Sequence, residues 1–372
     1  MLLRYDARPS RGASGENLAN GTALVNSSNL MVEPNPVEAG APPRARWRNV
    51  LRWTLLVAIT VGLLALLVRR VDWAQFLAAM KLAKFWQIAV AGAVAVSVCM
   101  WGCIERLWVL LGPLPHGGTA VGRLELASIH YASCAAHNLL PAPAGEVVRT
   151  VQLRRRHGYS VGVLVAAQLV EKVIESLGLG IEVLVVALLS PLPARLGVPM
   201  YVFAGIGAGG AIAVLLVAQR YHARHAGAAA TEAPDGAAIR GVRGHVTSFV
   251  RRLSEGMYLV RAPRIWAIGL FWSIVADLAN AATVGLVLSA LGIHLPVSAW
   301  FLVMLAARAA GLFPSTPGQF GVQEAAVVLV LSALGVDQSR AFAVAVLHHV
   351  VHFVPVTLAG LYELRRQWAE VK

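Results

Sequence analysis

The sequence predicts an all-α protein, a polytopic transmembrane helical bundle of about six spans plus two re-entrant hairpins broken by proline and glycine. Of its 372 residues, 57% are hydrophobic and only 14% are charged, and the mean hydropathy is +0.65. Soluble domains are about 45–50% apolar and about 25% charged, so both departures indicate lipid as the solvent. The apolar residues also gather in long runs, and a helix needs roughly 20 of them to cross a bilayer.

The chain divides into a polar tail and a membrane domain. Residues 1–43 are rich in Gly, Pro, Asn and Ser and predict a disordered cytoplasmic tail without a cleaved signal peptide. The membrane domain is expected over residues 44–365. Its predicted spans are 50–68, 85–111, 161–190, 198–218, 265–291 and 339–364. The polar, basic segment 219–264 predicts a cytoplasmic loop between two halves.

The net charge of +13 comes mostly from arginines beside the apolar runs. That placement follows the positive-inside rule and favours contact with anionic lipid, so we expect no nucleic-acid partner. The three cysteines, Cys99, Cys103 and Cys134, form no CxxC pair and lie in apolar stretches. They predict neither a disulfide nor a metal site, because free cysteine in such a place behaves as a small hydrophobe.

Two further apolar stretches, 120–157 and 298–335, are interrupted by turn residues. A full crossing at 120–140 would leave the Arg154–Arg156 cluster outside the cell, whereas a re-entrant hairpin keeps it in the cytoplasm. For the second stretch, two full crossings would preserve the topology equally well. Both termini are then cytoplasmic and the membrane is the bacterial inner membrane. The predicted turn residues are Pro141 and Gly145 in the first hairpin and Pro314, Pro317, Gly318 and Gly321 in the second.

The two halves resemble each other. Each has a long span ending in Leu-Gly, a Pro/Gly-broken hairpin, then Ser160 or Ser339 and an apolar run with ionisable residues at its centre. With the topology above, these two units are inverted repeats. Broken segments at matching positions of inverted repeats point to a transporter binding site near the midplane.

Ionisable residues within the apolar runs of the first half are stronger evidence for a binding site than the broken segments. Glu171 and Lys172 lie in the middle of the run 161–190, where a charge costs about 2.5–3.5 kcal/mol even on lenient scales. They either line a functional cavity or form structural pairs, Glu171–Arg149 or Glu146–Lys172. Arg149 is a candidate phosphate ligand, because guanidinium binds phosphate oxygens in a bidentate manner.

In the second half, Arg308 and Glu324 flank the Pro-Gly turn, and Arg308 is expected to face the same cavity as Arg149. His348 and His352 share a helix face, but zinc needs at least three placed ligands and no carboxylate lies nearby in sequence. Packing or a proton relay is the favoured interpretation of these histidines. No nucleotide-binding or hydrolase motif is present, so we expect no cofactor and no enzyme activity.

Three groups of residues together resemble a known family. They are Asn138-Leu-Leu-Pro141 with Gly145, Glu146 and Arg149; Glu171-Lys172 with Glu175; and Pro317-Gly318-Gln-Phe-Gly321-Val-Gln323-Glu324. This set is similar to the lysylphosphatidylglycerol synthase transmembrane family, flippase-like proteins, over residues 50–365. The resemblance implies translocation or binding of a lipid, without the soluble synthase domain. Lys172 and Glu175 stand where the family shows Arg and Asp, and Gln323 where it shows Arg, which puts the headgroup in doubt.

These observations lead to the hypothesis that the protein binds or translocates an anionic or zwitterionic phospholipid or polyprenyl-phosphate headgroup. Two alternatives stay open: a membrane-embedded enzyme acting on lipid, and a scaffold that recruits an enzyme of lipid or glycan biosynthesis through 219–264. The sequence does not determine the oligomeric state. The expected substrate-binding residues are Asn138, Glu146, Arg149, Glu171, Lys172, Arg308 and Glu324.

Overall fold

The computed structural model of the protein describes residues 60–140, 144–189, 262–311 and 317–369, besides a few isolated positions. Within these ranges the chain is helical, as predicted, and its only extended pairing is an isolated bridge between His116 and Tyr159. The tail 1–43, most of the run 198–218, the loop 219–264 up to residue 261, and both Pro141 and Pro314 lie outside the described residues.

The first half begins with the helix Thr60–Arg69 and the short helix α2 (Trp73–Leu82), which the Asp72 carboxylate caps. The predicted span 85–111 is one continuous rod made of α3 (Phe85–Val94), the π-helix η1 (Ala95–Cys99) and α4 (Met100–Leu111). A π-helix widens the turn and so disturbs the regular pairing of backbone carbonyls. Here the Tyr131 hydroxyl donates a hydrogen bond to the Val96 carbonyl inside η1.

The first hairpin consists of α5 (Arg123–Leu139) and α6 (Ala144–His157), and α7 (Val161–Leu189) follows it. The segment before α5 meets the segment after α6: the Gly118 N–H donates to the His157 carbonyl at 3.1 Å, and His116 bridges to Tyr159. The hairpin therefore starts and finishes at the same end of the bundle, as a re-entrant hairpin must.

The second half repeats this order with α10 (Pro263–Ala290), α11 (Val297–Ala310), the 3-10 turn η3 (Pro317–Gln319), α12 (Val322–Ala333) and α13 (Gln338–Ala369). Arg340 Nη2, at the start of α13, donates to the Leu291 carbonyl at 3.0 Å, at the end of α10. Both topologies left open for 298–335 allow this contact, but α11 and α12 have only 14 and 12 residues, fewer than the roughly 20 that a full crossing needs. The helix lengths therefore favour the re-entrant hairpin.

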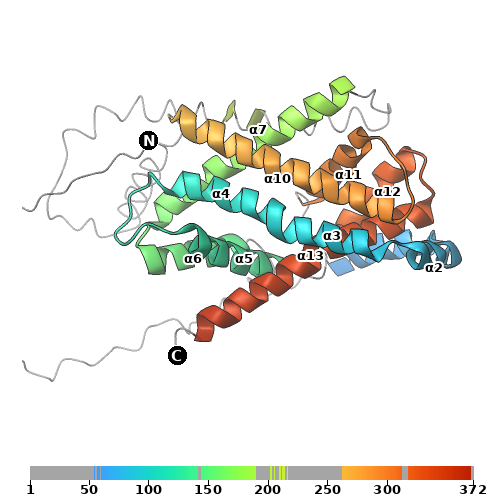
Figure 1. Ribbon diagram of the computed structural model, residues 1–372, viewed down its shortest axis with the longest axis horizontal. Coiled ribbons are helices and arrows are strands. Elements are labelled where there is room, and N and C mark those ends of the chain that lie inside the picture. The colour runs from blue at the N-terminus through green and yellow to red at the C-terminus, as the bar shows by residue number, and fades with distance from the viewer. Residues whose placement is uncertain are drawn as a thin grey trace, which may run out of the picture. The chain divides into compact units, whose positions relative to one another are not determined.

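The two hairpins enter from opposite ends. The Lys84 N–H at the start of α3 donates to the Ala290 carbonyl at the end of α10, at 2.9 Å, so α10 runs antiparallel to the α3–α4 rod. Figure 1 shows these two rods side by side, with α5 and α6 toward one end and α11 and α12 toward the other. The inverted arrangement is the one that the sequence predicts.

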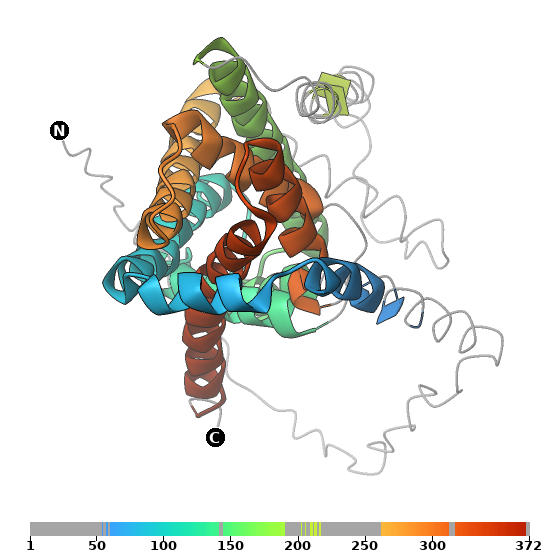
Figure 2. The same ribbon diagram turned by 90° about the vertical axis from the view of Figure 1, so that its right-hand side faces the viewer.

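Three described helical segments are long and apolar enough to cross a membrane: Phe85–Leu111, Pro263–Ala290 and Gln338–Ala369. Helix α7, with 29 residues, is also long enough, but its charged residues interrupt the apolar sequence. Helix α13 lies at the centre and contacts α2, α3, α5, α10 and α12 (Figure 2). The turn η3 packs against α5, so the tip of the second hairpin reaches the first.

Candidate functional site

Helix α7 carries a row of acidic residues on one face. The row consists of three glutamates with one glycine between them, at intervals of three or four residues: Glu171, Glu175, Gly178 and Glu182. This spacing places them on the same side of an α-helix. From Glu171 to Glu182 this row extends about 16 Å along the helix axis, roughly half the thickness of the hydrocarbon core. Hydrophobic residues on the opposite side of α7, among them Leu184 and Leu188, are exposed.

Two arginines from different helices bind Glu171. Arg149 Nη2 of α6 donates to Glu171 Oε2 at 3.0 Å, and Arg106 Nη2 of α4 donates to Glu171 Oε1 at 3.2 Å. All three side chains are buried. The Glu171–Arg149 pair considered from the sequence is therefore present, and it connects the first hairpin to the spanning helices.

The cluster continues through Arg106, which also pairs with Glu175 and donates to Ser273 Oγ at 3.0 Å. Lys172 Nζ lies 2.9 Å from Glu175 Oε2, yet the Lys172 side chain is 61% exposed. Three cations thus face two paired carboxylates, and Glu146, which acts on Arg149 from one turn earlier in α6, brings the formal charge of the cluster to zero. The alternative Glu146–Lys172 pair does not form among the described residues, because Glu175 takes Lys172.

A second ion pair, between Arg308 of α11 and Asp277 of α10, lies near the middle of α10. Arg308 is about 17 Å along α11 from its first residue, and Asp277 is about 20 Å from either end of α10. Such charges in the middle of apolar helices mark a functional site unless they only pair with each other. Arg308 retains a 33% exposed side chain, so part of its guanidinium is accessible.

Arg308 borders a polar cavity of about 310 Å³ between α10, the second hairpin and α13. Five of its nine lining residues carry an amide or imidazole side chain. His348 Nε2 is buried without a hydrogen-bond partner among the described residues. Arg149 is not part of this lining, because Glu171 holds it against α7, so the expectation that both arginines face one cavity is not met by this cavity. The lining residues are Asn280, Met304, Ala307, Arg308, Gly311, Gln319, Gln323, His348 and His352.

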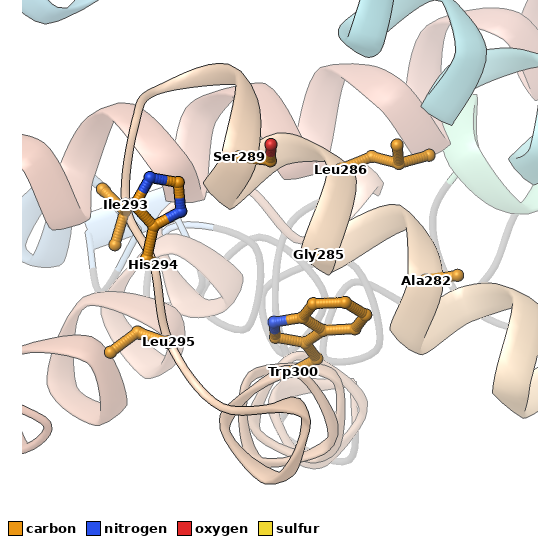
Figure 3. A pocket seen from close by; sticks show the side chains of 8 residues that line it. All are labelled: Ala282, Gly285, Leu286, Ser289, Ile293, His294, Leu295 and Trp300. Atoms are coloured by element: carbon orange, nitrogen blue, oxygen red, sulfur yellow. The ribbon is translucent and has the colours of Figure 1, made fainter.

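Figure 3 shows a larger cavity, of about 480 Å³, between the end of α10 and the start of α11. The Trp300 ring lies flat against Gly285, and a Cβ atom at Gly285 would come within 2.6 Å of that ring. Its lining is mostly apolar and includes no arginine or lysine. It therefore lacks the charge that would bind an anion.

Glu324 and Asn138 are occupied by structural contacts. Glu324 Oε2 accepts from the Gly321 N–H at 2.6 Å and thereby caps its own helix α12, and Glu324 Oε1 pairs with His349. Asn138 Nδ2 donates to Thr357 Oγ1 at 2.8 Å and joins α5 to α13. Glu146, in the first turn of α6, keeps one buried oxygen without a partner among the described residues.

The described turn residues of the second hairpin do break its helices. Gly318 and Gly321 have φ values of +74° and +83°, a backbone region that glycine adopts without strain, and Pro317 begins η3. Gly145, the second residue of α6, is helical and lies so close to α5 that a Cβ would be 2.6 Å from the Ser133 carbonyl oxygen. These residues allow backbone to approach backbone at membrane depth.

Sequence reasoning missed several polar residues of these clusters, among them Arg106, Glu182, Asn280 and Gln319. Arg106 and Glu182 are charges within apolar runs, and the rule that identified Glu171 would have found both. Gln319 lies inside the Pro-Gly turn and had no separate signal.

The comparisons with known proteins agree with this architecture. Residues 53–360 match the family described as "Lysylphosphatidylglycerol synthase TM region". The chain belongs to this family. Neither the curated proteins nor the solved structures give a match. The family resemblance inferred from the Pro317–Glu324 motif is therefore confirmed, and the protein is a multi-pass membrane protein.

Proposed function

We propose that this membrane domain binds the phosphate of a phospholipid or polyprenyl-phosphate headgroup and carries it across the bilayer. The observation that supports this proposal best is the polar cavity at Arg308, at the tip of a broken hairpin near mid-depth. A guanidinium has five N–H donors, and Asp277 engages only one side of it. The remaining donors are suited to phosphate oxygens.

The cavity supplies further polar groups of the right kind. The side-chain amides of Asn280, Gln319 and Gln323 can donate to phosphate or to headgroup hydroxyls. Its volume of about 310 Å³ is that of a small-ligand site, which suits a headgroup rather than acyl chains. The acyl chains would stay in the surrounding lipid.

In this proposal the Arg106–Arg149–Glu171 cluster has a supporting role. Its exposed cation, Lys172, attracts an anionic headgroup toward this side of α7. Its buried ion pairs hold α6 against α4 and α7. Arg149 and Glu171 therefore do not contact the substrate; they position the helices and contribute to the electric field around the site. The exposed Lys172 is the cluster member best placed to meet a headgroup directly.

The domain is proposed to work without catalysis, in the bacterial inner membrane with both termini in the cytoplasm. Purified protein incubated with phospholipid or polyprenyl phosphate should then release no product detectable by mass spectrometry over hours. A time-dependent product would favour the enzyme alternative. Recruitment of a biosynthetic enzyme through 219–264 would instead appear as loss of co-purification when that segment is deleted.

The transport proposal is tested in proteoliposomes that contain fluorescent phosphatidylglycerol, phosphatidylcholine or a short polyprenyl phosphate. Dithionite quenching from outside measures the fraction that has crossed. Arg308→Ala should lower the crossing rate at least tenfold, whereas Arg365→Ala, an exposed arginine on α13, should not change it. Equal rates in Arg308→Ala and the unmodified protein, at matched folded amounts, would remove Arg308 from the mechanism.

A further inference from the structure

Glu182, the last acidic residue in the row on α7, forms no ion pair of its own among the described residues. Its side chain is buried, with 7% of the residue exposed, and Val183 and Val186 beside it belong to the hydrophobic core. Neither Glu182 carboxylate oxygen has a hydrogen-bond partner among the described residues. An ionised carboxylate in such a place is costly, so it needs a partner or a proton.

The nearest charged groups are Asp277 and Arg308. Asp277 Oδ2 lies 3.7 Å from the position that a Cβ atom would take on Gly178, and Glu182 is one turn further along the same face of α7. This position on α7 places the Glu182 carboxyl beside the Asp277–Arg308 pair, whose two charges act on it through space. Two carboxyl groups therefore adjoin one arginine, and Arg308 already pairs with Asp277.

No other described neighbour balances the second carboxyl. Arg106, the next arginine, is paired with Glu171 and Glu175. The remaining titratable groups around the Asp277–Arg308 pair are two thiols, one from η1 and one from α4, a carboxylate from α7 itself and an imidazole from α13. They are Cys99, Cys103, Glu175 and His352.

We propose that Glu182 and Asp277 form a proton-binding site beside Arg308, sharing one proton when the cavity is empty and taking up a second when a phosphate anion binds. With one proton on the pair, the three groups sum to zero charge: one carboxylate, one neutral carboxyl and one guanidinium. Two carboxyl oxygens can also approach each other only with a proton between them, which supplies the donor that Glu182 lacks.

The second proton follows from charge balance, and this half of the proposal rests on the proposed function. A phosphate anion that pairs with the Arg308 guanidinium displaces the Asp277 carboxylate from it. The buried site would then hold two anionic groups against one cation unless Asp277 also becomes protonated. One proton from solution bonds to the Asp277 carboxylate and restores neutrality, so one proton and one anionic headgroup enter together. A proton gradient could then drive lipid movement.

The shared proton can be observed without any lipid ligand. Infrared difference spectra of the full chain in nanodiscs, made from neutral phospholipid, should contain the carbonyl stretch of a protonated carboxylic acid at neutral pH. Glu182→Gln and Asp277→Asn should each remove that band, because the remaining carboxylate pairs with Arg308. Glu125→Gln, at a partly exposed glutamate paired with Arg156, should leave it unchanged. A band that survives in both Glu182→Gln and Asp277→Asn would overturn the shared-proton site.

The second proton is measured by calorimetric titration with dihexanoyl phosphatidylglycerol in two buffers of different ionisation enthalpy. The unmodified protein should take up about one proton per lipid bound, and the double variant E182Q/D277N should take up none while still binding. Binding without proton uptake in the unmodified protein would overturn the coupled step. Absence of binding would sink the coupled step together with the proposed function, while the infrared result still decides the shared proton.

Discussion

Arg149 of the first re-entrant hairpin donates to Glu171 of α7 across 3.0 Å, and both side chains are buried. The contact joins α6 to α7. Helix α6 belongs to a hairpin that returns to the end of the bundle where it started, whereas α7 crosses the bundle. Arg106 binds the other oxygen of the same carboxylate. Glu171 is thus the point at which α4, α6 and α7 are held together by charge.

Replacing Glu171 by Ala should destabilise the bundle strongly. The change leaves Arg106 and Arg149 buried with too little negative charge, and breaking a buried pair from one side costs about 3–5 kcal/mol. Unfolding of the purified protein in detergent micelles, followed by circular dichroism, would measure the loss.

Lys172→Ala is the matched control, because this neighbour on the same helix is exposed and its pair with Glu175 is partly exposed. An exposed pair contributes about 0–1 kcal/mol, so the control should unfold almost like the unmodified protein. If the Ala variants at 171 and 172 were equally stable, the three-helix role of Glu171 would be refuted.

A second prediction concerns the π-helix η1. Tyr131→Phe removes the hydroxyl that donates to the Val96 carbonyl, and a buried acceptor left unpaired costs about 1–3 kcal/mol. Tyr362→Phe is the control, because that ring is 66% exposed on α13. A similar midpoint for both variants in the same unfolding assay would mean that the Val96 carbonyl finds another donor.

Much of the architecture follows from patterns that lie within one segment. The break in the second hairpin is encoded by three neighbouring residues, Pro317, Gly318 and Gly321. Proline has no backbone N–H to donate, and the two glycines adopt positive φ values. The spans likewise follow from run length, and the hairpin topology of 120–157 follows from the position of Arg154–Arg156. These are properties of neighbouring residues, so one sequence suffices.

The partners of the charges could not be obtained in the same way. Arg106 and Glu171 are 65 positions apart, and Arg308 and Asp277 are 31 apart, so their pairing depends on how helices pack in space. The sequence identified Glu324 as a site residue from its place after the Pro-Gly turn. Its hydrogen bond to the Gly321 N–H three residues earlier explains the same spacing as a helix cap.

A third prediction tests the contact between α5 and α13. A Cβ atom on Gly360 would lie 2.2 Å from the Tyr131 carbonyl oxygen, so Gly360→Ala forces the two backbones apart. We expect a loss of about 1–3 kcal/mol, the usual cost of overpacking a tight core. In the control variant Gly62→Ala, no atom lies within 4 Å of the added Cβ, so the protein should not be destabilised. Thermal unfolding in the same detergent compares the two, and equal melting temperatures would contradict the close packing.

The last prediction concerns the opposite entry of the two hairpins. Ala120 precedes α5 and His294 precedes α11, and both are exposed at opposite ends of the bundle. In a chain whose three cysteines are replaced by Ala, Ala120→Cys and His294→Cys should react with an impermeant maleimide from opposite sides of sealed cells.

Because the arginine clusters predict cytoplasmic ends for the first hairpin, Cys at 120 should label only after permeabilisation, and Cys at 294 before it. Permeabilised cells control for intrinsic reactivity, since both positions should then label fully. Labelling of both positions from the same side would show that the hairpins are not inverted in the membrane. The midplane cavity at Arg308 would then lose its structural basis, because it depends on the two broken segments meeting from opposite surfaces.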